Sequence, residues 1–229
     1  MKTIVLSAGH GGSDPGAVAN GLQEKTANLA IALACRDYLN QNYSGHKLIL
    51  PRETDKFVSL PARREMARGA DLYISIHNNS FSNSAAGGFE TFTHSGPVFE
   101  TTLEYQRVIH RNVYSYVHTL GVRDRGMKRA NHWVTRNMPC PTVLVEYMFV
   151  SNPQEASLLK YDHILKRLGE VTAKGIADCL KLPVKQQPPQ QAVWYRVIAG
   201  SYRDRNNAEV MVEQLKRQGI GAFIEVKDI

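Results

Sequence analysis

The sequence has 229 residues, of which 43% are hydrophobic and 21% are charged, and its formal net charge is +7. This length fits one sizeable domain with a small accessory, and no apolar run approaches the ~18 residues that a membrane span requires, which argues against a membrane partner. Three cysteines without CxxC spacing argue against a disulfide framework and against a thiolate zinc site.

Apolar runs of strand length alternate with helical patterns along most of the chain. In chain order, the patterns predict strands at 4–8, 47–50, 71–76, 88–93, 133–136 and 142–147. They predict helices near 26–40, 59–68, 100–120 and 162–180. Strands that alternate with helices indicate an α/β fold, in which helices cover both faces of one sheet.

A composition break separates this region from the end of the chain. Pro and Gln replace apolar periodicity at 182–192, which predicts an extended linker after a first domain at 1–181. Beyond it, 193–229 carries two strand patterns around a helical pattern that starts at an Asp cap. This predicts a small β-α-β unit, which at 37 residues is too short to hold itself together without a partner.

Polar side chains stand at the ends of three predicted strands. The first strand leads to His10, the strand at 71–76 leads to His77, and the strand at 142–147 carries Glu146. In an open α/β sheet, ligands bind beyond the carboxyl ends of the strands, so we expect these side chains to converge there. The glycines beside His10 would leave room for a substrate.

A carboxylate can join this group from the first helix. Thirteen residues, rich in glycine and other turn formers, separate His10 from Glu24, which is enough chain to fold Glu24 back towards the imidazole. His10, Glu24 and His77 would then form a two-histidine, one-carboxylate zinc site with its fourth position open to water. Zinc lowers the pKa of bound water from ~15.7 towards ~7, which makes hydroxide available at neutral pH.

Glu146 lies outside this ligand set and can serve as general base and acid. Asn79 and His132 are candidate substrate-binding residues, since one follows His77 closely and the other lies in a polar approach to a predicted strand. Each residue alone has a plainer interpretation, because a strand-end histidine is often structural and Glu24 could simply favour a helix start. Only the joint pattern indicates a metal.

Other functional classes have weaker support. A GxGxxG loop would need glycine where Asp14 stands, and neither a GxxxxGK[ST] loop nor a GxSxG elbow occurs. The positive charge fits an anionic partner, but equally a solubility feature. Nucleic acid is not an expected partner, because charge is its only support.

Several stretches resemble the zinc-dependent N-acetylmuramoyl-L-alanine amidases of the family often called amidase 3. They are "IVLSAGHGGSDPGAVANGLQEKTANLAIA", "RETDKFVSLPARREMARGADLYISIHNNS", "GGFETF" and "RDRGMKRANHWVTRNMPCPTVLVEYMFVSNPQEASLL". The resemblance covers about 2–180. It implies a twisted mixed sheet flanked by helices, as in zinc amidases and carboxypeptidases, and cleavage of the amide between N-acetylmuramic acid and the L-alanine of the peptidoglycan stem peptide.

By position, the resemblance places the family's ligands for one Zn²⁺ on His10, Glu24 and His77, and its catalytic glutamate on Glu146. The chain departs from the family pattern near these residues. It has Ser7-Ala8 where relatives commonly have Asp-Pro, Asn78 where they have Ala, and Tyr147-Met148 where they have Leu-Gly. These departures leave all four functional residues in place.

The C-terminal stretch "WYRVIAGSYRDRNNAEVMVEQLKRQGIGAFI" is similar to one repeat of the SPOR-like cell-wall-binding module. Such modules generally hold two β-α-β halves, and this chain has one. We therefore expect a homodimer, in which two chains pair their C-terminal halves to complete a four-stranded sheet. The alternative is a half-repeat that packs on its own catalytic domain, which would also cover the strand edges.

These features together predict an amidase that binds peptidoglycan through 193–229. The first strand is too short and too soon interrupted for a signal peptide, so we expect synthesis in the cytoplasm and action on the wall after the membrane is breached. A phage endolysin is the favoured setting, and a mother-cell lysis enzyme is the other. Another zinc peptidase acting on stem peptides and a non-catalytic cell-wall-binding protein stay open as alternatives.

Overall fold

The computed structural model describes residues 1–136, 138–186 and 198–226. The chain divides into two compact units, Met1–Gln186 and Gln187–Ile229. The strands of the first unit are β1 (Lys2–Ala8), β2 (Val18–Ala19), β3 (Leu22–Gln23), β4 (His46–Ile49), β5 (Leu72–Asn79), β6 (Phe89–His94), β7 (Asp124–Ala130) and β8 (Thr142–Phe149). Its helices are α1 (Glu24–Asn42), α2 (Leu60–Met66), α3 (Thr102–Val117), the 3₁₀ turn η1 (His118–Leu120), α4 (Pro153–Leu158) and α5 (Asp162–Leu180).

Six of these strands form one mixed sheet in the order β4-β1-β5-β8-β6-β7. Strands β4, β1, β5 and β8 are parallel, whereas β6 runs antiparallel to β8 and parallel to β7. The central strands β1, β5 and β8 carry almost continuous buried runs, as expected for strands that are covered on both faces. The predicted α/β fold with a mixed sheet is confirmed.

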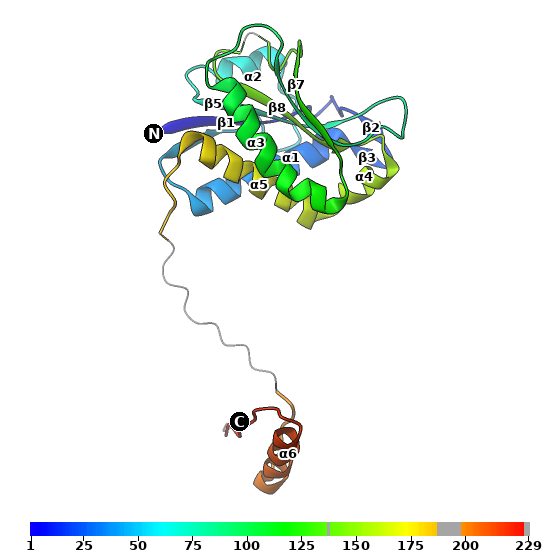
Figure 1. Ribbon diagram of the computed structural model, residues 1–229, viewed down its shortest axis with the longest axis vertical. Coiled ribbons are helices and arrows are strands. Elements are labelled where there is room, and N and C mark those ends of the chain that lie inside the picture. Colours follow the sequence, from blue (N-terminus) through cyan, green and yellow to red (C-terminus); the bar gives the residue numbers. More distant parts are fainter. Residues whose placement is uncertain (137, 187–197, 227–229) are drawn as a thin grey trace. The chain divides into compact units, whose positions relative to one another are not determined.

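Three long helices cover one face of the sheet (Figure 1). Helix α5 packs between α1 and α3, and Ile4, Leu6 and Ile74 from the strands lie in the same hydrophobic core. Successive residues of a strand point to opposite faces of the sheet. On the face away from the three helices, Val5 and Tyr73 pack in a smaller hydrophobic cluster beside the end of α2. The parallel strands β1, β5 and β8 therefore direct their carboxyl ends to one edge of a sheet that is fixed on both faces.

The strand predicted at 133–136 is wrong. These residues form a turn, in which the main-chain nitrogens of Thr135 and Arg136 donate to the carbonyl oxygen of His132 at 3.2 and 2.9 Å. The strand of this region is β7, which lies earlier, at the sheet edge. Its sequence, DRGMKRA, is mostly polar, as suits an edge strand that is largely exposed. A search for apolar runs therefore does not detect it.

The C-terminal unit shows the predicted helix as α6 (Arg205–Arg217), where the side chain of Asp204 accepts a hydrogen bond from the main chain of Asn206. The predicted strands do not form over their described residues, 198–202 and 220–226, and the rest of the first strand, 194–197, lies outside the described residues. A strand is held by hydrogen bonds to a neighbouring strand, and the described residues of this unit include no strand that could pair with another.

Most of the predicted linker, 187–192, also lies outside the described residues. The residues before it are attached to the first unit. Leu182 is buried, the carbonyl oxygen of Pro183 accepts from the main chain of Ser44 at 2.9 Å, and Val184 bridges Tyr43.

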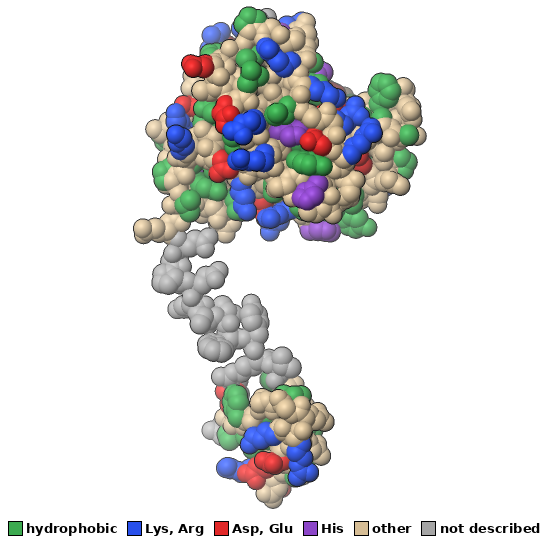
Figure 2. All heavy atoms as spheres, viewed as in Figure 1, with side chains coloured by type: hydrophobic (Ala, Val, Ile, Leu, Met, Phe, Trp, Pro, Cys, Tyr) green, Lys and Arg blue, Asp and Glu red, His purple; other side chains and the backbone are tan. Residues whose placement is uncertain are grey.

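The surface of the first unit carries charges of both signs. Figure 2 shows basic and acidic side chains interspersed over the displayed face, without one large basic patch. Within the described residues, none of the helices combines the length and apolar character needed to cross a bilayer.

Candidate metal site and adjoining pocket

His10 lies just beyond β1 in a strained main-chain conformation, with φ at 60°. Two buried arginines hold this segment. Arg52 donates to the carbonyl oxygens of Ala8 and Gly9 at 3.2 and 2.8 Å, and Arg63 donates to those of Ala8 and His10 at 2.6 and 2.7 Å. Burial lowers the pKa of Arg52 to about 10, and the positive charge of Arg63 adds to this effect.

The glycines around His10 are required by close packing. A Cβ atom on Gly9 would lie 2.2 to 2.6 Å from the ring of His77, and one on Gly16 would lie 2.6 Å from the ring of His10 and 2.7 Å from Glu24. Gly16 also has φ at +68°, which side chains rarely adopt. These glycines therefore let the imidazoles and the carboxylate approach one another.

Glu24 is the first residue of α1 and is 5% exposed. Its Oε2 accepts from the main chain of Ala17 at 3.0 Å, while Oε1 accepts from the side chain of Asn28 at 3.0 Å and from the main chain of Asn78 at 3.2 Å. Burial alone would raise the pKa of Glu24, but hydrogen bonds from His10 and His77 outweigh it and hold the pKa far below its ordinary range.

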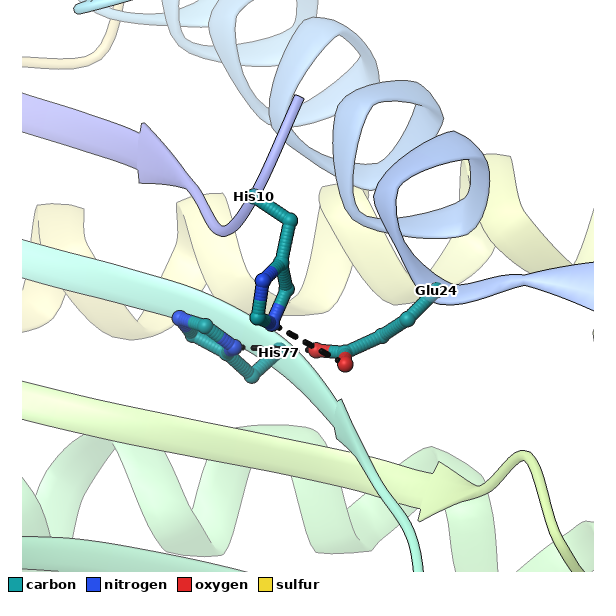
Figure 3. Close-up of side chains that lie close together, drawn as sticks. All are labelled: His10, Glu24 and His77. Carbon is teal, nitrogen blue, oxygen red and sulfur yellow. Dashed lines mark hydrogen bonds and ion pairs between the residues drawn. The ribbon is translucent and has the colours of Figure 1, made fainter. Parts of the chain in front are cut away.

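Both imidazoles point at this carboxylate (Figure 3). Nε2 of His10 lies 3.1 Å from Oε2 of Glu24, and Nδ1 of His77 lies 2.9 Å from Oε1. One potential ligand atom from each of the three residues lies within 4.8 Å of the others. The structure thus brings together the three residues named from the sequence, in an arrangement that could hold a metal ion.

Asp14 orients His10 from behind. Its Oδ2 lies 2.8 Å from Nδ1 of His10, the nitrogen that faces away from Glu24. Burial would lower the pKa of His10, but hydrogen bonds to Glu24 and Asp14 raise it. A carboxylate on the outer nitrogen of a histidine ligand fixes the ring and increases its basicity, so Asp14 belongs to the site.

Glu146 lies beside His77 in the sheet. His77 of β5 is paired in register with Glu146 of β8, which is paired in register with Glu90 of β6, so the three form one row. Oε2 of Glu146 is buried without a hydrogen-bond partner among the described residues. Burial raises the pKa of Glu146 well above its ordinary value, and the negative charges of Glu24 and Glu90 raise it further.

A pocket of about 480 Å³ opens beside this row, and Glu146 lines it. Both candidate substrate residues from the sequence lie in its wall. Asn79 donates to Oε1 of Glu90 at 2.6 Å, and the ring of His132 stands edge-on to Phe92, with centroids 4.8 Å apart. Burial lowers the pKa of His132, which favours a neutral ring at this position.

Sequence reasoning did not identify Asp14 or Glu90. Glu90 could have been found by the argument used for Glu146, because both are carboxylates within apolar strands. Asp14 was considered only as an interruption of a glycine motif. Two departures from the family pattern serve the site, since Oγ of Ser7 accepts from Arg63 at 2.9 Å and the side chain of Asn78 donates to Asn28 at 2.9 Å.

Comparison with known proteins shows which families the chain resembles. A family model described as N-acetylmuramoyl-L-alanine amidase matches residues 4–178, and one described as SPOR domain matches residues 166–224. The sporulation-specific N-acetylmuramoyl-L-alanine amidase of Bacillus subtilis (strain 168) is 35% identical over 230 residues, covering 100% of this chain and 86% of the relative. The endolysin of Bacillus phage SPP1 is 38% identical over 187 residues, covering 80% of this chain and 68% of the relative.

Solved structures show the same fold. The catalytic domain of CwlV, an N-acetylmuramoyl-L-alanine amidase from Bacillus (Paenibacillus) polymyxa var. colistinus, superposes with a TM-score of 0.72 at 33% identity. The match covers 80% of this chain and 99% of that structure.

Replacing Glu146 by Gln is expected to stabilise the metal-free protein at neutral pH. Because the pKa of Glu146 is raised in the folded state, that state keeps a proton which the unfolded chain releases above about pH 4.3, so this group's contribution to stability falls as pH rises. The advantage of the variant should be near zero at pH 4 and grow by up to about 1.4 kcal/mol per pH unit until the raised pKa is reached.

Urea unfolding of chelator-treated protein between pH 4 and pH 8 measures this difference. Glu100→Gln, at an exposed position, is the matched control and should show no such growth with pH. An advantage of Glu146→Gln that is the same at every pH would contradict the prediction.

Proposed function

The chain belongs to the N-acetylmuramoyl-L-alanine amidase family, and from this premise we propose that His10, Glu24 and His77 bind one zinc ion and that Glu146 transfers the protons of the reaction. The bond cleaved joins the lactyl group of N-acetylmuramic acid to the L-alanine of the stem peptide. The convergence of the three ligand atoms within 4.8 Å is the observation that carries the proposal.

The donor set suits zinc. Two imidazole nitrogens and one carboxylate oxygen are typical catalytic zinc ligands, and three protein ligands leave one tetrahedral position open. When bound, zinc polarises the substrate carbonyl and lowers the pKa of water towards neutrality. Around it, Glu24 supplies the negative charge, and Asp14 together with the arginine clamp, Arg52 and Arg63, keeps His10 facing inwards.

Glu146 is suited to move protons between the attacking water and the leaving amine. It accepts a proton from the water as the new C–O bond forms and delivers that proton to the nitrogen as the C–N bond breaks. Its raised pKa supports this role, as does its Oε2, which lies beside the pocket without a hydrogen-bond partner among the residues that the structure describes. Asn79 and His132, in the same wall, are proposed to contact substrate.

The C-terminal half-repeat is proposed to bind peptidoglycan and to pair with a second copy. Its described residues include no buried side chain, and large apolar groups are exposed, with Ile198, Phe223 and Val226 each more than three-quarters exposed. Such a unit gains a core by burying these groups against an identical half, whose strands would also complete its sheet.

We further propose that the enzyme meets the wall after the membrane is breached. The endolysin relative, whose match covers 80% of this chain, supports this setting. The sporulation-specific relative matches the whole chain, including the C-terminal unit, which favours release during spore formation as a second setting. Detecting the protein in its source cells after phage induction or during spore formation separates the two.

Mass spectrometry of the products released from purified peptidoglycan tests the activity. We expect stem peptides with free N-terminal L-alanine, lost on chelation and restored by zinc. Glu146→Gln should keep zinc but lose about 10²–10⁴-fold in turnover, whereas His77→Ala should lose both. Released D-alanine would indicate a different zinc peptidase, no release would favour a non-catalytic wall binder, and an active Glu146→Gln would remove Glu146 from its role.

Asp14→Asn is expected to weaken zinc binding by about 10–100-fold, because the amide holds the ring of His10 less firmly. Competition with a chromophoric chelator measures the affinity. Asp37→Asn, at an exposed position of α1 where Asp37 pairs with Arg36, is the control and should bind zinc as the wild type does. Equal affinities for Asp14→Asn and wild type would contradict the orienting role.

Sedimentation of the full chain tests the pairing of half-repeats. A dimer of the 25.6 kDa chain is expected at micromolar concentration. Phe223→Asp should shift it to monomer, whereas Phe99→Asp, an exposed phenylalanine of the first unit, should not. A monomeric wild type would contradict pairing and favour a half-repeat that packs on its own chain.

A further inference from the structure

The pocket beside Glu146 has a wall that the proposed chemistry leaves unused. Glu90, Arg125 and Lys128 lie in this wall, together with the aromatic rings of Phe92 and Phe149. Arg125 and Lys128 come from the edge strand β7, and Glu90 comes from its neighbour β6. A catalytic group therefore shares its pocket with a fixed cluster of three charges.

The charges in this cluster do not balance. Oε2 of Glu90 accepts from Nε of Arg125 at 3.0 Å and also from Nζ of Lys128, while its other oxygen accepts from Asn79. In this wall one carboxylate thus pairs with two cations; Glu155 also acts on Arg125 electrostatically, but its charge is shared with Arg123. Within the described residues, Glu146 forms no ion pair with either cation, and its Oε2 has no hydrogen-bond partner there. The cluster carries a surplus positive charge.

The two cations are held in place and can be reached from the pocket. The guanidinium of Arg125 lies 5.0 Å from the ring centre of Phe149, and Nζ of Lys128 lies 5.7 Å from that of Phe92. Their side chains are 26% and 37% exposed, whereas that of Glu90 is 3% exposed. The buried carboxylate and the rings orient the cations, and their accessible donors remain available to an anion.

In the proposed substrate, the anionic group nearest to the cleaved amide lies on the peptide side of that bond. The carboxyl group of muramic acid is consumed in the amide that is cleaved, and the sugar rings are uncharged. The nearest carboxylate is the α-carboxyl of the D-glutamate that follows L-alanine in the stem peptide, and in some walls this group is a neutral carboxamide. A surplus positive charge in the pocket attracts the carboxylate more strongly than the neutral carboxamide, and so favours stems with free D-glutamate.

We propose that Lys128 and Arg125 bind this α-carboxylate and make the enzyme select stems with free D-glutamate over stems with the carboxamide. The inference rests on the proposed amidase function. It assigns the two basic residues of β7 to substrate specificity, and Glu90 to holding them in place.

A competition within one digestion tests the selection. The substrate is peptidoglycan whose stems carry a mixture of free and amidated D-glutamate, and mass spectrometry follows both L-alanine-terminated products over time. Their relative rates give the ratio of kcat/KM. The wild type should release free stems about five- to tenfold faster, as expected for a charge-assisted contact that is partly exposed. Lys128→Gln and Arg125→Gln should each bring the ratio towards one.

The ratio separates specificity from a structural effect. A variant that only damages the fold or Glu146 slows both products equally and leaves the ratio unchanged. Lys47→Gln, which removes the same charge from β4 at the opposite edge of the sheet, is the control and should keep the wild-type ratio.

Equal release of both stems by the wild type, or an unchanged ratio in both variants, would overturn the inference. Failure to release L-alanine-terminated peptide from either stem would instead remove the amidase function on which it rests.

Discussion

A buried carboxylate requires donors, and the site is organised around this requirement at Glu24. Main-chain nitrogens, an asparagine amide and two imidazoles all point at its two oxygens. These donors keep the carboxylate ionised. They also place two imidazole nitrogens and one carboxylate oxygen close enough together to bind one metal ion. A metal ion bound between the two imidazoles and Glu24 would keep this attraction, because the carboxylate would then face the positive charge of the metal.

The surroundings of Glu24 show how the fold maintains this arrangement. Arg52 and Arg63 are buried, and they donate to the carbonyl oxygens of the segment that carries His10, which holds its strained main chain. Glycines stand where any side chain would displace the rings. Much of the sequence near the site therefore positions His10 rather than taking part in chemistry.

The two units of the chain differ in how they obtain stability. The first has a continuous core beneath its sheet and needs no partner to bury it. In the second, an amphipathic helix has formed, the described residues of the predicted strands have not formed strands, and none of the described apolar side chains is fully buried. A helix satisfies its own main-chain hydrogen bonds, whereas a strand needs a neighbouring strand, which explains why the helix is the element of the β-α-β pattern that the described residues form.

The sequence by itself determined the α/β fold and put forward His10, His77 and Glu146, because polar groups at the ends of apolar strands are expected at the ligand edge of a sheet. It put forward Glu24 because the turn-rich segment after His10 is long enough to fold back. It could not locate β7, whose polar residues are those of an exposed edge, nor predict that 133–136 would close a turn on His132. Only the tertiary structure decided that Asp14 lies behind His10 and that Glu90 gathers Arg125 and Lys128 beside Glu146. Strand periodicity reports which residues are buried, but strand order and register decide which of them meet, since those depend on contacts between distant segments.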